Sequence, residues 1–205
     1  MNRKRVLILA EGYEEKYYID KIISFPCMSK SYYFEPLINL KGNGQIIPRY
    51  QYLFQLNKYD LILVFGDADN GSDQFIRIIE GLGKLIFGDE NKGRLVFIFV
   101  NPVAMQIILS HFEKVCLTHK AKMKNRSEIE RITGIKDYDA KEEQIKELVG
   151  MINLKNYSMM KENIKDLSID YKECPSSNIL SFLEKFENDD SSWIDEINAQ
   201  ITLLM

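Results

Sequence analysis

The sequence predicts an α/β protein with a mostly parallel, four-stranded sheet, helices on both faces of that sheet and a helical appendage at the C-terminal end. Three observations support this fold class. Short, continuous apolar runs, typical of strands buried on both faces, occur at residues 5–10, 61–65 and 95–100. Segments with apolar residues at helical spacing separate these runs, which indicates parallel strands joined by right-handed crossovers. After residue 118 every periodic segment is helical.

The predicted strands differ in composition. They are expected at residues 5–10, 32–40, 61–65 and 95–100. The second is rich in aromatic and β-branched residues, but Pro36 cannot donate a ladder hydrogen bond, which weakens this strand or favours an edge position. The third reads L-I-L-V-F without a polar residue, as a parallel strand covered on both faces does.

Helices are predicted between and after these strands, at residues 13–25, 47–56, 72–85 and 103–115. In the first helix, Tyr18, Ile19 and Ile22 recur at helical spacing. Pro26 then ends that helix, because the residue before a proline is disfavoured in the helical conformation. Ser72 is a candidate N-cap for the third helix.

The last part of the chain is predicted to be helical throughout. Helices are expected at residues 127–132, 140–152, 158–167, 178–187 and 193–204. No strand stands out among them. We therefore divide the chain into an α/β domain at residues 1–118 and a helical appendage at residues 119–205, packed on that domain.

Composition describes an ordinary globular protein. The 205-residue chain is 45% hydrophobic and 28% charged, which suits one compact core with an appendage. Its three cysteines show no C-x-x-C spacing, which favours free thiols in a reducing compartment. The apolar run after the basic N-terminus is too short for a signal peptide, and no segment is long enough to span a bilayer. We therefore expect a cytoplasmic protein without a membrane partner.

The net charge of −3 argues against a protein dominated by a nucleic-acid-binding surface, although it leaves room for local basic patches. One such patch runs from residue 119 to residue 131 and includes Lys120 and Lys122. Two interpretations of this patch stay open. It is either a solvated linker or an arm whose lysines contact phosphate groups.

Acidic side chains follow two of the predicted strands at the point where each strand ends. Glu11 follows the first strand, and Asp67 and Asp69 follow the third. Ligands of open α/β sheets bind at the carboxyl ends of the strands, so these carboxylates are placed for cation chemistry. Hard oxygen ligands suit Mg²⁺. A zinc site is a poor alternative, because neither of the two histidines has a cysteine at ligand spacing.

Two segments resemble the Toprim domain of primases, topoisomerases and small RNA-processing nucleases: V-L-I-L-A-E-G-Y-E-E and L-I-L-V-F-G-D-A-D-N-G. The family's glutamate after the first strand, followed by a glycine, matches Glu11. Its D-x-D motif, with a glycine shortly after, matches Asp67, Asp69 and Gly71. The family often has a second acid four residues after the first, which is Glu15 here.

A third segment, V-N-P-V-A-M-Q-I-I-L-S-H-F, is similar to the asparagine-proline and histidine-phenylalanine framework of RloB-like proteins. These form a Toprim-like group associated with bacterial restriction and phage-defence loci. Asn101 and His111 fit the framework, whereas Met105 and Ile107 stand where the group carries a glutamate and a tryptophan. The resemblance covers residues 5–112 and does not extend to the tail.

The resemblance implies a Rossmann-like Toprim fold and Mg²⁺-dependent chemistry on nucleic acid, with Mn²⁺ as a possible substitute. It implies that Glu11 acts as a general acid or base and that Asp67 and Asp69 hold the cation, with Glu15 as a further ligand. Together with the basic patch, it gives four candidates for contact with substrate: Asn101, His111, Lys120 and Lys122.

Each of these positions also has a purely structural interpretation. Glu11 could cap the helix that follows it, and the D-A-D-N-G segment could be a simple turn. Glu14 and Glu15 suit charges in the first turn of a helix. His111 lies on an apolar helix, where a core histidine is commoner than a catalytic one.

Two functions stay open on the sequence alone. The first is a Mg²⁺-dependent nuclease or phosphodiesterase that acts on DNA or RNA in phage defence or RNA processing. The second is a catalytically inactive Toprim-like module that partners another protein such as an ATPase. The acidic composition, Met105 and the helical tail favour the second.

Overall fold

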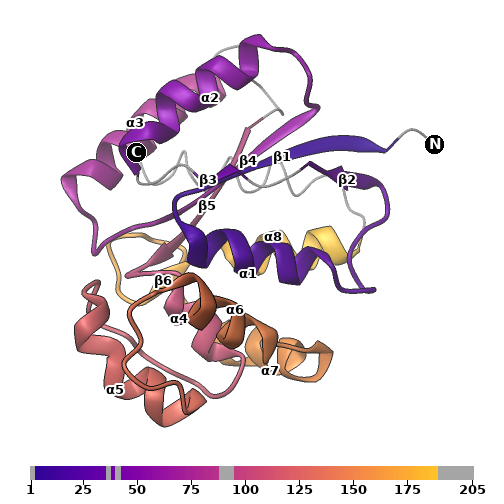
Figure 1. The fold of residues 1–205 in the computed structure, drawn as a ribbon. Helices are drawn as coiled ribbons and strands as arrows, with labels where there is room; N and C mark the ends of the chain where they lie inside the picture. Colours follow the sequence, from indigo (N-terminus) through magenta and orange to yellow (C-terminus); the bar gives the residue numbers. More distant parts are fainter. Residues whose placement is uncertain (1–2, 36–37, 40–42, 88–94, 189–205) are drawn as a thin grey trace.

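A parallel sheet forms the centre of the computed structural model, which describes residues 3–35, 38–39, 43–87 and 95–188 (Figure 1). The strands are β1 (Lys4–Ala10), β2 (Tyr32–Phe34), β3 (Ile38–Asn39), β4 (Leu61–Asp67), β5 (Leu95–Asn101) and β6 (Ser176–Ser177). Their order is β2-β1-β4-β5-β6, and β3 also pairs with β1. All of these pairs are parallel except β5 with β6. The predicted α/β class and mostly parallel sheet are confirmed.

The sheet has more strands than the four predicted. The predicted strand at 32–40 corresponds to two short strands, β2 and β3, on either side of residues 36–37. The sixth strand, β6, lies in the tail, so the prediction of a purely helical tail is wrong. Two consecutive serines carry no apolar alternation, which is why the sequence pattern does not reveal this strand.

The helices are α1 (Tyr13–Ile23), α2 (Ile46–Gln55), α3 (Asp73–Phe87), α4 (Met105–Ser110), α5 (Lys122–Thr133), α6 (Glu142–Gly150), α7 (Leu154–Ile164) and α8 (Ile179–Glu187), and η1 (Asn43–Gln45) is a 3₁₀ turn. The predicted N-cap is confirmed, because the Ser72 hydroxyl oxygen accepts a hydrogen bond from the Phe75 N–H at 3.2 Å. In the described ranges, no helix has both the length and the apolar character to cross a bilayer.

Some of the predicted helices differ from the observed helices in their bounds, and one lies outside the described residues. α4 is shorter than the predicted helix at 103–115, and α5 begins before the predicted helix at 127–132. Polar residues dominate α5, so its hydrophobic pattern is weak although Ile129 is buried. The predicted helix at 193–204 lies outside the described residues.

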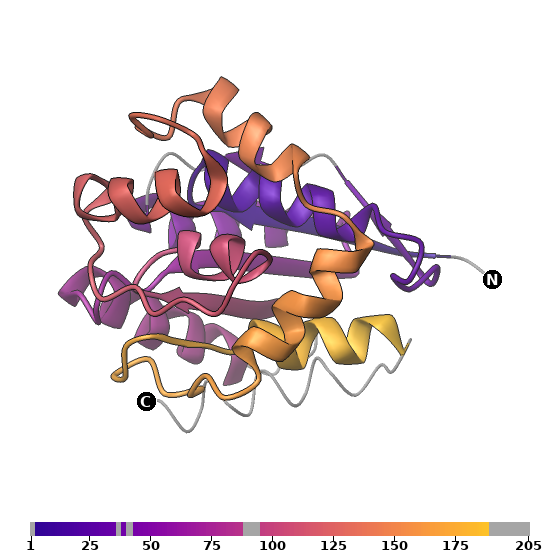
Figure 2. The ribbon, with the colours of Figure 1, turned by 90° about the horizontal axis from the view of Figure 1, so that it is seen from below.

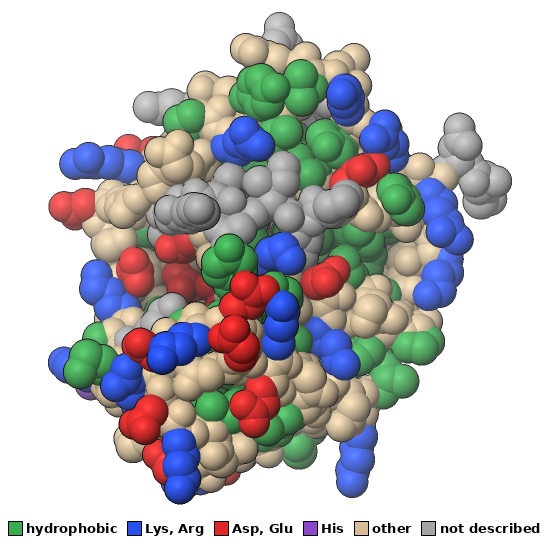
Figure 3. All heavy atoms as spheres, viewed as in Figure 1, with side chains coloured by type: hydrophobic (Ala, Val, Ile, Leu, Met, Phe, Trp, Pro, Cys, Tyr) green, Lys and Arg blue, Asp and Glu red, His purple; other side chains and the backbone are tan. Residues whose placement is uncertain are grey.

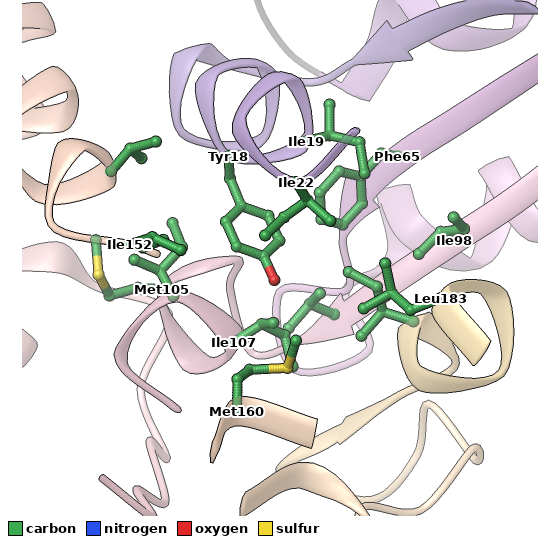
Figure 4. Close-up of a cluster of buried hydrophobic side chains, with 14 of the residues drawn as sticks. Tyr18, Ile19, Ile22, Phe65, Ile98, Met105, Ile107, Ile152, Met160 and Leu183 are labelled. Atoms are coloured by element: carbon green, nitrogen blue, oxygen red, sulfur yellow. The ribbon is translucent and has the colours of Figure 1, made fainter. Parts of the chain in front are cut away.

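Two hydrophobic layers cover the two faces of the sheet (Figures 1 and 2). Alternate side chains of β1 and β4 point to opposite faces, so Ile8 belongs to one layer and Leu9 to the other. Helices α2 and α3 cover the Leu9 face, while α1, α4 and α8 cover the Ile8 face. In Figure 4, Tyr18 of α1 and Ile107 of α4 point into the layer on the Ile8 face, where Met160 of α7 meets them.

The tail forms part of the hydrophobic layer on the Ile8 face. Helix α6 packs on α1, α7 packs on α4, and α8 packs on β5. The Asn178 side chain completes the edge of the sheet, because its Oδ1 accepts from the Phe99 N–H and its Nδ2 donates to the Phe97 carbonyl, both at 2.9 Å. The division of the chain at residue 118 stays a prediction, but the two parts share one core.

Candidate active site at the ends of strands β1 and β4

The ends of β1 and β4 bring Glu11 and Asp67 together. The two strands are neighbours in register, with Ala10 opposite Phe65, so both leave the sheet at the same edge. The Glu11 N–H donates to the Phe65 carbonyl at 3.1 Å. The Glu11 carboxylate accepts a hydrogen bond from the Asp67 N–H at 3.0 Å. Glu11 therefore reaches across to β4, and Gly12 occupies the N-cap position of α1.

Glu15 turns back from the first turn of α1 toward the same strand ends. Its Oε2 accepts a hydrogen bond from the Gly12 N–H at 2.7 Å. A Cβ at position 12 would lie 2.9 Å from that oxygen, so a larger residue there would force the Glu15 carboxylate to shift. Glu15 is 3% exposed, so this first-turn acid is buried at the strand ends, and its predicted role as a metal ligand stays a prediction.

Glu14 is buried beside Glu15, and the sequence interpretation missed it as a site residue. Its Oε1 accepts a hydrogen bond from the Tyr138 hydroxyl at 2.8 Å, which links the tail to the site. A signal for this burial was present. Residues four apart share a helix face, and Glu14 precedes the apolar residue Tyr18 by four positions. No comparable pattern marks Tyr138.

Glu11, Glu14, Glu15 and Asp67 form what we call the acidic cluster. Burial raises the pKa of Asp67 well above its usual range, and the charges of Glu15, Glu11 and Glu14 add to this effect. The hydrogen bond that Asp67 accepts from the Ala104 N–H at 2.7 Å opposes it. Burial, Glu14 and Glu11 likewise raise the pKa of Glu15 to about 8. The cluster thus favours the binding of protons or of a cation.

Asp69 follows in a tight turn after β4. The backbones of Asp69, Asn70 and Gly71 are all left-handed, with φ angles of 52°, 58° and 69°. This turn breaks the strand alternation that would otherwise direct Asp67 and Asp69 to the same side. Partial burial of the Asp69 carboxyl group raises its pKa, and the positive charge of Lys120 opposes that shift. The charge that acts on Asp69 is thus a lysine, whereas those that act on Asp67 are acids.

Asn101 holds this turn in place. Its Oδ1 accepts a hydrogen bond from the Asn70 N–H at 2.9 Å. Its Nδ2 donates to the carbonyl oxygens of Tyr171 and Glu173, at 2.9 Å and 2.6 Å. Asn101 is 1% exposed, and these hydrogen bonds give it a structural role at the edge of the site; its predicted contact with substrate stays a prediction.

His111 lies in the core rather than at the surface. Its Nε2 is 3.1 Å from the Tyr18 hydroxyl oxygen, and the two rings meet edge to face. Burial lowers the pKa of His111 to about 3, with Asn156 opposing the shift, so the imidazole is neutral. The predicted contact of His111 with substrate stays a prediction, and it would require the core to open.

Most of the basic patch, from Lys122 onward, belongs to helix α5, and both interpretations of its lysines stay open. Arg126 and Arg131 are engaged in ion pairs with acidic side chains. Lys120 is exposed just before α5 and acts electrostatically on Asp69. The side chain of Lys122 lies outside the described part of the structure.

The acidic cluster suits a divalent cation in its chemistry. Four carboxyl groups supply hard oxygen donors, and burial together with mutual repulsion disfavours their simultaneous ionisation. In the described residues, however, no three acidic, histidine or cysteine side chains are arranged around one point as metal ligands. Ligation by three of them therefore requires side chains to turn out of their present hydrogen bonds.

Comparison of the chain with protein-family models, with curated proteins and with solved structures found no match. The resemblance to Toprim and RloB-like proteins thus stays an expectation. The function has to be inferred from the residues of the acidic cluster and from their surroundings.

Proposed function

We propose that this protein is a Mg²⁺-dependent, Toprim-like nuclease that cleaves phosphodiester bonds in DNA or RNA, in phage defence or RNA processing. One observation supports this most strongly. Four carboxyl groups from β1, α1 and β4 gather at the carboxyl edge of a parallel sheet, where their burial raises the pKa of two of them.

Each residue has a task in this proposal. Asp67, with Glu15, would hold the cation, and Glu11 lies close enough to Asp67 to exchange a proton with a phosphodiester oxygen at the same place. A bound Mg²⁺ supplies positive charge against the phosphate oxygens. Lys120, beside Asp69, provides a second positive charge for the nucleic-acid backbone.

Cleavage of labelled single-stranded and duplex DNA and RNA, with Mg²⁺, Mn²⁺ or EDTA, tests the proposal. Asp67→Asn keeps an oxygen for the Ala104 N–H but removes the charge, so we expect a loss of roughly 100-fold or more. Asp73→Asn is the matched control, because Asp73 is an exposed acid in the first turn of α3. Equal cleavage by the wild type and Asp67→Asn would trace the activity to a contaminant and refute the proposal.

A second function, an inactive module that binds a partner such as an ATPase, is favoured by three observations. Asp67 is engaged by the Ala104 N–H, and no ready-made set of three metal ligands occurs in the described ranges. Met105, where the RloB-like framework carries a glutamate, is buried in the core. Calorimetric titration with Mn²⁺ separates the two functions. Heat of binding that disappears in Asp67→Asn supports the nuclease, and its absence supports the module.

A further inference from the structure

Two tyrosines of α1 form a stack beside the acidic cluster. The rings of Tyr13 and Tyr17 lie 6.1 Å apart between centroids, and their planes differ by 18°. Tyr13 is 43% exposed. It also precedes the buried Glu14 directly in the chain, so the exposed ring and the acidic cluster share the first turn of α1.

Two lysines lie close to the ring of Tyr17, the less exposed member of this stack. The Nζ of Lys16 lies 4.4 Å from the centroid of Tyr17, and the Nζ of Lys146 lies 5.3 Å from it. The Tyr17 hydroxyl donates a hydrogen bond of 2.5 Å to Glu142, which in turn pairs with Lys146 at 2.7 Å. Tyr17 is therefore fixed between α1 and α6, and it supports the more exposed Tyr13 from behind.

A shallow groove of about 330 Å³ continues from this stack along α1 and α6. Tyr17, Lys21, Ser24 and Lys146 line it together with Asp20. Basic and acidic side chains are interspersed on the face shown in Figure 3. Asp20 in the groove, and Glu142 paired with Lys146 beside it, offset part of the positive charge, so a ligand here would be held by stacking as well as by charge.

We propose that the Tyr13–Tyr17 stack is a base-stacking platform that binds single-stranded nucleic acid next to the acidic cluster. Every base has a π-face, so the exposed Tyr13 ring, stacked on the Tyr17 ring that two lysines contact, binds single strands with little sequence preference. In a duplex the bases already stack on one another and cannot offer their faces to Tyr13. The link between this platform and cleavage rests on the proposed function, but the binding itself does not.

Binding is measured by fluorescence anisotropy on the full-length chain in EDTA, so that cleavage cannot interfere. The probes are twelve-nucleotide oligo(U), oligo(dT) and a duplex of equal length. We expect the single strands to bind more tightly than the duplex, and Tyr13→Ala to weaken that binding roughly tenfold. Tyr13→Trp should retain it, because the indole also stacks. Tyr33→Ala is the matched control, since Tyr33 is an exposed tyrosine on β2.

The RNA and DNA probes show which sugar the site prefers, and either preference agrees with the platform. Wild-type affinity in Tyr13→Ala, equal affinity for the duplex, or no binding of single strands by the wild type would each overturn it. The proposed function fails separately. If Tyr13→Ala loses binding but the wild type never cleaves with Mg²⁺, the platform stands and the nuclease does not. If cleavage depends on Asp67 while Tyr13→Ala binds normally, the nuclease stands alone.

Discussion

At Glu15, burial and two neighbouring acids oppose a negative charge and raise the pKa of the carboxyl group from 4.5 to about 8. The folded protein therefore binds this proton more tightly than the unfolded chain does. The resulting stabilisation is complete below about pH 4.5 and is lost as the pH rises through about 8. Asp67 changes stability in the same direction, because its pKa is also raised.

Glu15→Gln removes this charge while it keeps an oxygen for the Gly12 N–H. We expect the variant to unfold at the same temperature as the wild type near pH 5. At pH 9 we expect it to be more stable by on the order of 5 kcal/mol, or roughly 10–20 °C in Tm. Thermal unfolding by circular dichroism at both pH values measures the difference. Asp20→Asn, an exposed acid of the same helix, should show no such change, and parallel pH profiles of wild type and Glu15→Gln would contradict the pKa assignment.

The individual acids show how far sequence alone leads. The ends of two predicted strands were enough to bring Glu11 and Asp67 to one edge, because parallel neighbours end together. The position of Asp69 could not be predicted, since it depends on three left-handed residues in succession. The charge of Glu14 suits the first turn of any helix, and only its spacing of four from Tyr18 indicates that it is buried.

At the scale of elements, a hydrogen bond from the Tyr138 hydroxyl connects the segment between α5 and α6 to α1. Tyr138 is buried, and its hydroxyl donates to Glu14 at 2.8 Å. Its backbone carbonyl accepts a hydrogen bond from Arg126 at 2.7 Å, and Arg126 also pairs with Asp139. This contact joins the basic helix α5 to the acidic cluster, which no local sequence pattern foretells because 124 positions separate Tyr138 from Glu14.

Tyr138→Phe tests this tie. Removal of the hydroxyl leaves the buried Glu14 carboxyl without a donor that it has in the wild type, so we expect a loss of about 1–3 kcal/mol in the free energy of unfolding. Urea denaturation at pH 7 measures it. The exposed Tyr33 provides the control, and Tyr33→Phe should stay within about 0.5 kcal/mol of the wild type. Equal stability of both variants would show that the hydroxyl contributes nothing.

At the scale of the whole molecule, the far edge of the sheet is completed by the tail. β6 pairs with the end of β5, and the buried Asn178 side chain bonds to Phe97 and Phe99 as a further strand residue would. The sequence predicted the alternating α/β part because apolar periodicity is local. The sequence did not predict that the tail completes this edge, because a strand of two serines and a single asparagine show no hydrophobic periodicity.

Asn178→Ala leaves a buried N–H and a buried carbonyl of β5 unpaired. We therefore expect a loss of about 2–4 kcal/mol in the free energy of unfolding, measured by urea denaturation. Asn188→Ala is the control, because within the described residues the Asn188 side chain donates to the Glu184 carbonyl at an exposed helix end. A cost for Asn178→Ala no larger than that of the control would show that β5 does not depend on this side chain.

The pairing of β5 with β6 also has a consequence for folding during synthesis, because β6 is made long after β5. The partner of Asn101 in β6 is Ser176, which is synthesised about 75 residues later. At about 5–20 residues per second, the nascent chain carries an unpaired strand edge with the sequence F-I-F-V for roughly 4–15 s. An apolar edge of this kind is a template for association with other chains. Substitutions that slow the docking of β6 and Asn178 should therefore lower the yield of soluble protein during synthesis more than they lower the stability of the finished molecule.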